Sequence, residues 1–259
     1  MYKGHRVAVV MPIHNEENHV ARAIERVPHY VDTIIAVDDG STDGTWAQLS
    51  RIPQRRLQRV RHVTNRGVGA ATKTGYRRAL DLGADLVAVM DGDGQMHGGD
   101  LWRLLDRALE GADYVKGNRF LDVKTISSMP SGRRAGNLFL SWLTRVAVKS
   151  PAPLDAQCGY TVIRGTALQR LCFDDLYDSY GFPNAMLFAA MAASLKVACV
   201  RVRCVYGTEV SGINPFTAIP RILYLIGRGC VMLRFKSRSR RVTPVLQIIP
   251  ARGTDGRQA

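Results

Sequence analysis

Two aspartates separated by a single glycine follow one of the most apolar segments of the chain. Asp91, Gly92 and Asp93 come directly after Leu86–Met90, and Gln95 stands two positions later. Carboxylate and amide oxygens are the ligands that hard divalent cations prefer, and the glycines let a bulky ligand approach the backbone. An acidic, glycine-rich turn would have the same composition. The place of the motif after a buried strand favours a metal site made of Asp91, Asp93 and Gln95.

Three other polar motifs in the first hundred residues also follow apolar segments. They are Pro12-Ile13-His14-Asn15-Glu16, Val37-Asp38-Asp39 with the turn behind it, and Asn65-Arg66-Gly67-Val68-Gly69. In open α/β sheets, ligands bind at the carboxyl ends of the parallel strands. A cation held there can act as a Lewis acid on a departing diphosphate. Together the motifs predict a metal-dependent nucleotide-sugar site.

Asp39 and His14 are candidates for contact with the nucleotide. A carboxylate at a strand end can accept hydrogen bonds from a base or a ribose, so we assign Asp39 to the nucleotide and Asp43 to helix capping. Asn15 is also a good helix cap. His14 alone would be an ordinary structural histidine, but its place beside Asp39 favours a nucleotide contact.

The glycines of the Asn65–Gly69 segment have two interpretations. They resemble a phosphate-cradling turn, although the lysine–serine pair of a P-loop is missing, and close packing of a helix on a strand explains them equally well. Arg119 and Arg133 are candidates for anion binding, because the guanidinium fork fits phosphate oxygens. Arg134 is expected on a solvated basic face.

Alternating strands and helices must position these motifs. Apolar runs predict strands at Arg6–Met11, Thr33–Val37, Leu57–Val63 and Leu86–Met90, and helical spacing predicts helices at Glu17–Val27, from near Asp43 and at Val68–Leu82. This β-α order requires right-handed crossovers and a mostly parallel sheet. We therefore expect an α/β, Rossmann-like nucleotide-binding fold with helices on both faces of the sheet.

The second half of the chain departs from this alternation. Further helices are expected at Leu101–Leu109, Leu138–Val148, Asn184–Ser194 and Pro215–Arg234, and strands at Tyr114–Lys116, Gly159–Ile163 and Val197–Val205. Ser127–Arg134 is expected to be a flexible basic segment. The boundaries that follow are a main domain over 1–212, an amphipathic helix over 213–236 and a basic, mobile tail over 237–259.

Composition favours one large domain with anionic partners. The chain has 259 residues, 46% of them hydrophobic, and a net charge of +14. Such a charge suits nucleotide phosphates, anionic lipid headgroups or nucleic acid, and it is also compatible with simple solubility. Basic residues are not interleaved with aromatic ones, which argues against nucleic acid.

The cysteines, the N-terminus and the apolar segments indicate the compartment. Five cysteines without a Cys-x-x-Cys pair favour reduced thiols rather than disulfides or zinc. The chain enters its first strand without a signal-peptide pattern, and Phe216–Phe235 is interrupted by a proline and arginines, unlike a membrane span. We expect a cytoplasmic protein that is peripheral on an anionic membrane surface, where the Pro215–Arg234 helix would lie on the bilayer or pack into the core.

Taken in order, these motifs resemble a family 2 glycosyltransferase of the branch that contains dolichol-phosphate mannose synthases and other polyprenyl-phosphate sugar transferases. The resemblance runs from about Val7 to Arg234 and includes Gly117-Asn118-Arg119 and Asp155-Ala156-Gln157-Cys158-Gly159-Tyr160. It implies a GT-A fold, a GDP- or UDP-sugar donor, Mg²⁺ or Mn²⁺, and inversion at the anomeric carbon.

The resemblance also implies roles by position. Contacts with the nucleotide sugar are expected from Pro12, His14, Glu16, Val37, Asp39 and Gly92. Asp91, Asp93 and Gln95 are expected to bind the metal and the diphosphate. Arg119 and Arg133 are expected to bind the acceptor phosphate or the donor diphosphate. Asp91, Asp93, Arg119 and Asp155 are the residues expected to act in catalysis. The sequence departs from the family at Asn137, Ala185, Cys204 and Gly212, where a hydroxyl, an acid, an arginine and a lysine are usual. These departures bear on the acceptor and leave the metal motif intact.

Three functions follow, and the first two differ in the acceptor. A polyprenyl phosphate is already an anion, so its glycosylation requires positioning and charge neutralisation rather than a strong base. A glycan hydroxyl would require a carboxylate base, for which Asp155 is the candidate and Asp174, Asp175 or Asp178 are substitutes. The third hypothesis is a non-catalytic, basic membrane- or nucleic-acid-binding protein on a transferase scaffold.

Overall fold

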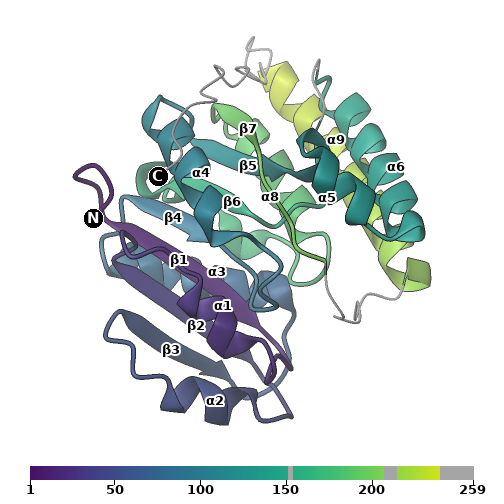
Figure 1. The fold of residues 1–259 in the computed structure, drawn as a ribbon. Coiled ribbons are helices and arrows are strands. Elements are labelled where there is room, and N and C mark those ends of the chain that lie inside the picture. The colour runs from purple at the N-terminus through teal and green to yellow at the C-terminus, as the bar shows by residue number, and fades with distance from the viewer. Residues whose placement is uncertain (151–153, 207–214, 240–259) are drawn as a thin grey trace.

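A single sheet with helices on both faces (Figure 1) separates two hydrophobic cores. The computed structural model describes residues 1–150, 154–206 and 215–239, the last of these with side chains only for 220–233. Alternate residues of each central strand enter opposite cores, as Val7 and Val9 do on one face and Ala8 and Val10 on the other. Strands buried on both faces explain why the sequence shows continuous apolar runs rather than alternation.

The sheet has seven strands in the order β3-β2-β1-β4-β6-β5-β7. Their bounds are β1 Val7–Ile13, β2 Thr33–Asp39, β3 Leu57–His62, β4 Leu86–Val89, β5 Tyr114–Asn118, β6 Thr161–Arg164 and β7 Val197–Arg201. All neighbours are parallel except β6, which runs antiparallel to both β4 and β5. The predicted parallel sheet is confirmed for β1 to β4, whose carboxyl ends carry the four motifs.

Helices cover both faces of the sheet. The α-helices are α1 Val20–Glu25, α2 Thr45–Arg51, α3 Val68–Asp81, α4 Leu101–Leu109, α5 Val123–Ser128, α6 Ser131–Ala147, α7 Gly165–Leu168, α8 Phe182–Ala192 and α9 Pro215–Ser239, and the 3-10 turns are η1 Gly98–Asp100, η2 Arg119–Leu121 and η3 Phe173–Asp175. One core contains side chains of α1, α2 and α4, and the other contains those of α3, α8 and α9.

The prediction of a flexible segment at Ser127–Arg134 was wrong. The segment contains the end of α5 and the first turn of α6. Asp122 caps α5 by accepting a hydrogen bond from the Thr125 amide at 2.9 Å, and Pro130 directly precedes α6. Polar helix caps and a proline look like a loop when only composition is considered.

Helix α9 is present, but much of its apolar face packs against the protein core and is not free to contact a bilayer. Ile222, Leu225 and Ile226 are buried, and α9 packs against α8 and α6. Core packing therefore accounts for the apolar face of this helix, whereas Tyr224 and Val231 are exposed. Within the described part of the chain, no helix has the length and apolar character that crossing a membrane requires. The predicted tail lies outside the described residues from position 240 onward.

Candidate active site

A cavity of about 810 Å³ opens at the carboxyl ends of β1, β2 and β4. Ten of the twelve residues to which the resemblance assigns a role line it: Pro12, His14, Glu16, Asp39, Asp91, Gly92, Asp93, Gln95, Arg119 and Arg133. Val37 and Asp155 are not among the lining residues, because Val37 is in the core and Asp155 is fully buried. The strand ends thus bring together motifs that lie up to about 120 residues apart, as parallel sheets do.

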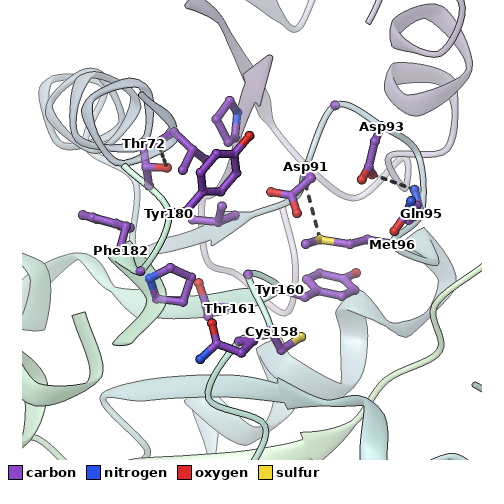
Figure 2. Close-up of a pocket in the computed structure, with 18 of the residues that line it drawn as sticks. Thr72, Asp91, Asp93, Gln95, Met96, Cys158, Tyr160, Thr161, Tyr180 and Phe182 are labelled. Carbon is purple, nitrogen blue, oxygen red and sulfur yellow. Dashed lines mark hydrogen bonds between the residues drawn. The ribbon is translucent and has the colours of Figure 1, made fainter. Parts of the chain in front are cut away.

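Asp91 and Asp93 stand on the same loop at the end of β4 (Figure 2). The Asp91 amide donates to the Met96 sulfur at 3.4 Å, and the Gln95 amide donates to Asp93 Oδ1 at 2.9 Å, so the loop is folded back on itself. Burial, followed by repulsion from Asp93, raises the pKa of Asp91 to about 7. A cation placed between the two carboxylates would relieve this repulsion.

The donor atoms suit a hard divalent cation whose coordination shell is completed by a ligand. Among the described residues, no group of three or more His, Cys, Asp or Glu side chains is close enough to hold an ion alone. Mg²⁺ and Mn²⁺ sites in nucleotide enzymes commonly combine one or two carboxylates with phosphate oxygens. Gln95 Oε1 accepts a weak hydrogen bond from the Cys204 thiol at 3.9 Å. The metal roles of Asp91, Asp93 and Gln95 remain predictions.

We expect the affinity for Mn²⁺ to rise with pH. Metal ligands bind as anions, and the pKa of Asp91 is raised to about 7, so below that pH a proton must leave before the metal binds. The dissociation constant should fall about tenfold between roughly pH 6 and pH 8. Calorimetry in buffers of different ionisation enthalpy should detect proton release at the lower pH and little at the higher. Equal affinity without proton release would contradict this expectation.

His14, Asp39 and Asn65 form a connected network in the part of the cavity where the sequence predicts nucleotide contacts. His14 Nδ1 lies 2.9 Å from the Asp39 carbonyl oxygen and its Nε2 lies 2.9 Å from the Asn65 amide nitrogen. Both ring nitrogens are therefore engaged, which leaves the ring face rather than its edge for a ligand. Asp39 accepts hydrogen bonds from His62 Nδ1 at 2.6 Å and from the Gly67 amide at 2.7 Å. Much of its hydrogen-bonding capacity thus holds the loop in place.

The glycines of the Asn65–Gly69 segment serve packing rather than phosphate binding. The Gly69 and Ala70 amides at the start of α3 donate to the Asp178 carbonyl oxygen at 2.7 and 3.1 Å. A Cβ on Gly69 would lie 2.4 Å from the Tyr177 carbonyl oxygen. The helix N-terminus is therefore covered by the protein's own backbone, and the phosphate-cradle interpretation does not apply to these amides.

Gly69→Ala is expected to destabilise the protein by about 1–3 kcal/mol, because the added methyl group would overpack against backbone that cannot rotate away. Gly227→Ala is the matched control: it lies in α9, a Cβ there has no neighbour within 4 Å, and better helix propensity should stabilise by about 0.5–1 kcal/mol. Urea unfolding of both variants measures the difference. A neutral effect at Gly69 would show that the segment around Tyr177 yields easily.

Arg119 reaches the cavity from a buried ion pair. Its Nε and one terminal nitrogen donate to the two carboxylate oxygens of Asp155 at 2.6 and 3.0 Å, and Asp155 also accepts from the Arg119 amide. Both Asp155 oxygens are thus occupied and the residue lies outside the lining, a poor position for the general base that a hydroxyl acceptor would require. The substitutes are no better placed: Asp174 pairs with Arg77, Asp178 pairs with Lys73, and none of Asp174, Asp175 and Asp178 lines the cavity.

Sequence reasoning missed several residues on the far wall of the cavity. Tyr180 lies in the turn before α8, and Figure 2 shows its ring on the side of the cavity that faces Asp91. Burial and then the carboxylates of Asp91 and Glu16 raise the pKa of the Tyr180 phenol. Gly159 belongs to a motif that the sequence offered, and a Cβ there would lie 3.3 Å from Asp91 Oδ2. Its lack of a side chain keeps the space beside Asp91 open.

The departures from the family pattern have different locations. Asn137 and Cys204 line the cavity, whereas Ala185, in the first turn of α8, does not. The guanidinium of Arg133 lies 5.2 Å from the centre of the Tyr206 ring, which places a cation at the same wall as Cys204. Gly212 lies outside the described residues.

Known proteins share the sequence pattern and the fold. A family model described as "Glycosyl transferase family 2" matches residues 8–172. A UDP-N-acetylglucosamine–dolichyl-phosphate N-acetylglucosaminyltransferase of Methanococcus voltae is 28% identical over 79% of this chain and 87% of its own length. A polyprenol monophosphomannose synthase of Mycolicibacterium smegmatis is 31% identical over 68% of each chain.

The fold also matches a crystal structure of glucosyl-3-phosphoglycerate synthase from Mycobacterium tuberculosis in complex with Mn²⁺ and UDP-glucose. The TM-score is 0.64 at 19% identity, over 88% of this chain and 80% of that chain. At this identity the likeness concerns the fold alone.

Proposed function

The chain belongs to glycosyl transferase family 2, and from this premise we propose that it transfers a sugar from a nucleotide-diphosphate donor to a polyprenyl phosphate with inversion. The observation that carries the proposal is the pair of carboxylates, Asp91 and Asp93, which line the cavity just after the end of β4. Mg²⁺ or Mn²⁺ held there would neutralise the diphosphate as it leaves. Asp39 and His14 would position the nucleotide.

The distribution of acidic groups favours a phosphate acceptor over a hydroxyl acceptor. Among the described lining residues, the acidic side chains are Glu16, Asp39, Asp91 and Asp93, all assigned to the donor side. A hydroxyl would require a further carboxylate as base, but a phosphate monoester is already ionised. Arg133 and Arg119 line the same cavity and provide cationic groups for its negative charge.

The relatives support the lipid nature of the acceptor. The name of one relative specifies dolichyl phosphate as the acceptor, and the name of the other specifies polyprenol monophosphomannose as the product. The apolar part of the cavity wall, which includes Leu140, Phe182, Met186 and Ile222, suits the first isoprene units of such a molecule. We propose accordingly that the chain meets its acceptor at the surface of a membrane, with either GDP or UDP as the donor nucleotide.

Transfer of radiolabelled sugar into a butanol-extractable lipid phosphate tests the proposal. GDP-mannose, UDP-glucose and UDP-N-acetylglucosamine are each incubated with Mn²⁺ and a short-chain polyprenyl phosphate soluble in mild detergent. We expect label in the organic phase with at least one donor and none when a chelator is added. Transfer to a glycan hydroxyl, with none to the lipid phosphate, would contradict the assignment of the acceptor.

A further inference from the structure

Helix α6 has four exposed apolar side chains that do not line the cavity. Leu138, Phe139, Trp142 and Val146 are 47%, 52%, 55% and 58% exposed, and we call them the α6 apolar strip. They recur at helical spacing on one side of the helix, and the rings of Phe139 and Trp142 stack with their centroids 6.4 Å apart. A contiguous group of large exposed apolar side chains marks an interaction surface rather than ordinary solvent-facing protein.

The other side of α6 forms part of the cavity wall. Arg133, Gly136, Asn137 and Leu140 line the cavity, and Leu140 is buried in the core. A single helix therefore has one side at the proposed acceptor site and the other at the apolar strip. Whatever covers the strip comes within one helix diameter, about 10 Å, of the cavity.

The charge around the strip has one sign. Residues 123–150 contain no Asp or Glu, and Arg145 and Lys149 are exposed close to the strip. Helix α9 lies beside α6 (Figure 1); residues 215–239 also lack acidic groups, and Arg221 is exposed. On the described residues of α6 and α9, the charged side chains are therefore all cations, and an apolar strip on such a surface is complementary to an anionic interface with an apolar interior.

We infer that the α6 apolar strip inserts into the surface of a bilayer that contains anionic phospholipid. Exposed apolar side chains of an amphipathic helix enter the region between headgroups and acyl chains, and neighbouring Lys and Arg bind the headgroups. A second copy of the chain suits this face poorly, because two faces without acidic groups would repel each other. Nucleic acid would leave Leu138 and Val146 without an apolar partner.

This inference changes which helix meets the membrane. Ile222, Leu225 and Ile226 of α9 are occupied by core packing, so the strip on α6 provides the larger apolar contribution. Docking through α6 would bring Asn137 and Leu140 near the headgroups, where a polyprenyl phosphate resides. The benefit of this docking for catalysis rests on the proposed function, but binding of the protein to vesicles is measured without any sugar transfer.

Vesicle co-sedimentation of the full chain tests the inference. Wild-type protein should bind phosphatidylcholine vesicles with about 30% phosphatidylglycerol, and binding should weaken at about 1 M salt because headgroup attraction is screened. The double variant Phe139→Ser/Trp142→Ser should lower the partition coefficient at least about tenfold. Val63→Ser is the matched control, since Val63 is 99% exposed and follows β3, the strand at one edge of the sheet, rather than lying on α6.

Fluorescence gives a second readout that does not depend on a loss of binding. Brominated lipids should quench the tryptophan emission of wild-type protein, and Trp142→Phe should bind vesicles but lose most of the quenching, since Trp46 and Trp102 lie on other helices. Unchanged binding of the double variant, or unchanged quenching of Trp142→Phe, overturns the inference. A third result would also overturn it: wild-type protein does not bind vesicles, forms a dimer in sedimentation velocity, and loses that dimer in the double variant. Vesicle binding without transfer to any lipid phosphate would refute the proposed function alone.

Discussion

Asp93→Ala is expected to lower the rate of sugar transfer by about 1,000-fold, equivalent to roughly 4 kcal/mol of transition-state stabilisation. The diphosphate gains charge as the bond to the sugar breaks, and the variant would lose one of the two carboxylates predicted to hold the neutralising cation. Asp91 alone would offer the cation a single carboxylate and would therefore hold it more weakly than the pair does. Initial rates with the preferred donor, at saturating metal, measure the effect.

The control for this variant is an acidic residue that pairs with a cation outside the cavity. Asp174→Ala removes an exposed carboxylate that pairs with Arg77, and its rate should stay within about twofold of wild type. Asp93→Asn should fall between wild type and Asp93→Ala, since an amide oxygen is a weaker ligand than a carboxylate. A rate for Asp93→Ala near that of Asp174→Ala would contradict the assigned role.

Asp155→Ala is expected to destabilise the folded state by about 3–5 kcal/mol. Asp155 is fully buried, and the guanidinium of Arg119 that it binds is also buried, so the variant leaves a charge without a partner in the interior. The same pair connects the end of β5 to the segment that carries Gly159, so the wall beside Asp91 should also loosen. Equilibrium unfolding in urea measures the loss.

Two comparisons separate the cost of an orphaned charge from the loss of a contact. Arg119→Met/Asp155→Ala should recover part of the stability lost in Asp155→Ala, because no unpaired charge is left buried. Asp174→Ala breaks an exposed pair and should cost no more than about 1 kcal/mol. If Asp155→Ala costs as little as Asp174→Ala, the buried pair is not a structural element of the wall.

The first half of the fold was readable from the sequence because each strand is followed locally by its own helix. Strands buried on both faces give long apolar runs, and the observed bounds of β2 and β3 lie within two residues of the prediction. The likeness of the fold to that of glucosyl-3-phosphoglycerate synthase confirms the expected GT-A-type fold class. Helix α1 is shorter than predicted, at Val20–Glu25, because the residues after Asn15 form turns tied to Ser41 and Thr45.

The second half depends on contacts that local patterns do not contain. Strand β6 begins at Thr161 and pairs antiparallel between β4 and β5, which are far from it in sequence. Apolar periodicity shows that a helix has an apolar face, but not whether core, lipid or another chain covers it. For this reason the sequence favoured α9 as the helix with an exposed apolar face. In the structure the α9 face is largely buried, and α6 carries the exposed strip.

The candidate site was predicted best where the residues share a loop. Asp91 and Asp93 lie in one turn, so their proximity follows from the sequence alone. The network of His14, Asp39 and Asn65 joins three loops, and its parts were recognised without their hydrogen bonds. Tyr180 had no local signal that marks it as part of the cavity wall.

Calorimetric titration with UDP and with GDP, each with Mn²⁺ and again with a chelator, tests most directly whether Asp91 and Asp93 hold the cation that binds the diphosphate. Wild-type protein should bind at least one of the two nucleotides, and chelation of the metal should weaken that binding at least about 100-fold. Asp91→Ala/Asp93→Ala should bind as weakly with Mn²⁺ as wild type does without it. Nucleotide binding that is equally tight in the chelator, or that survives in the double variant, would contradict the account.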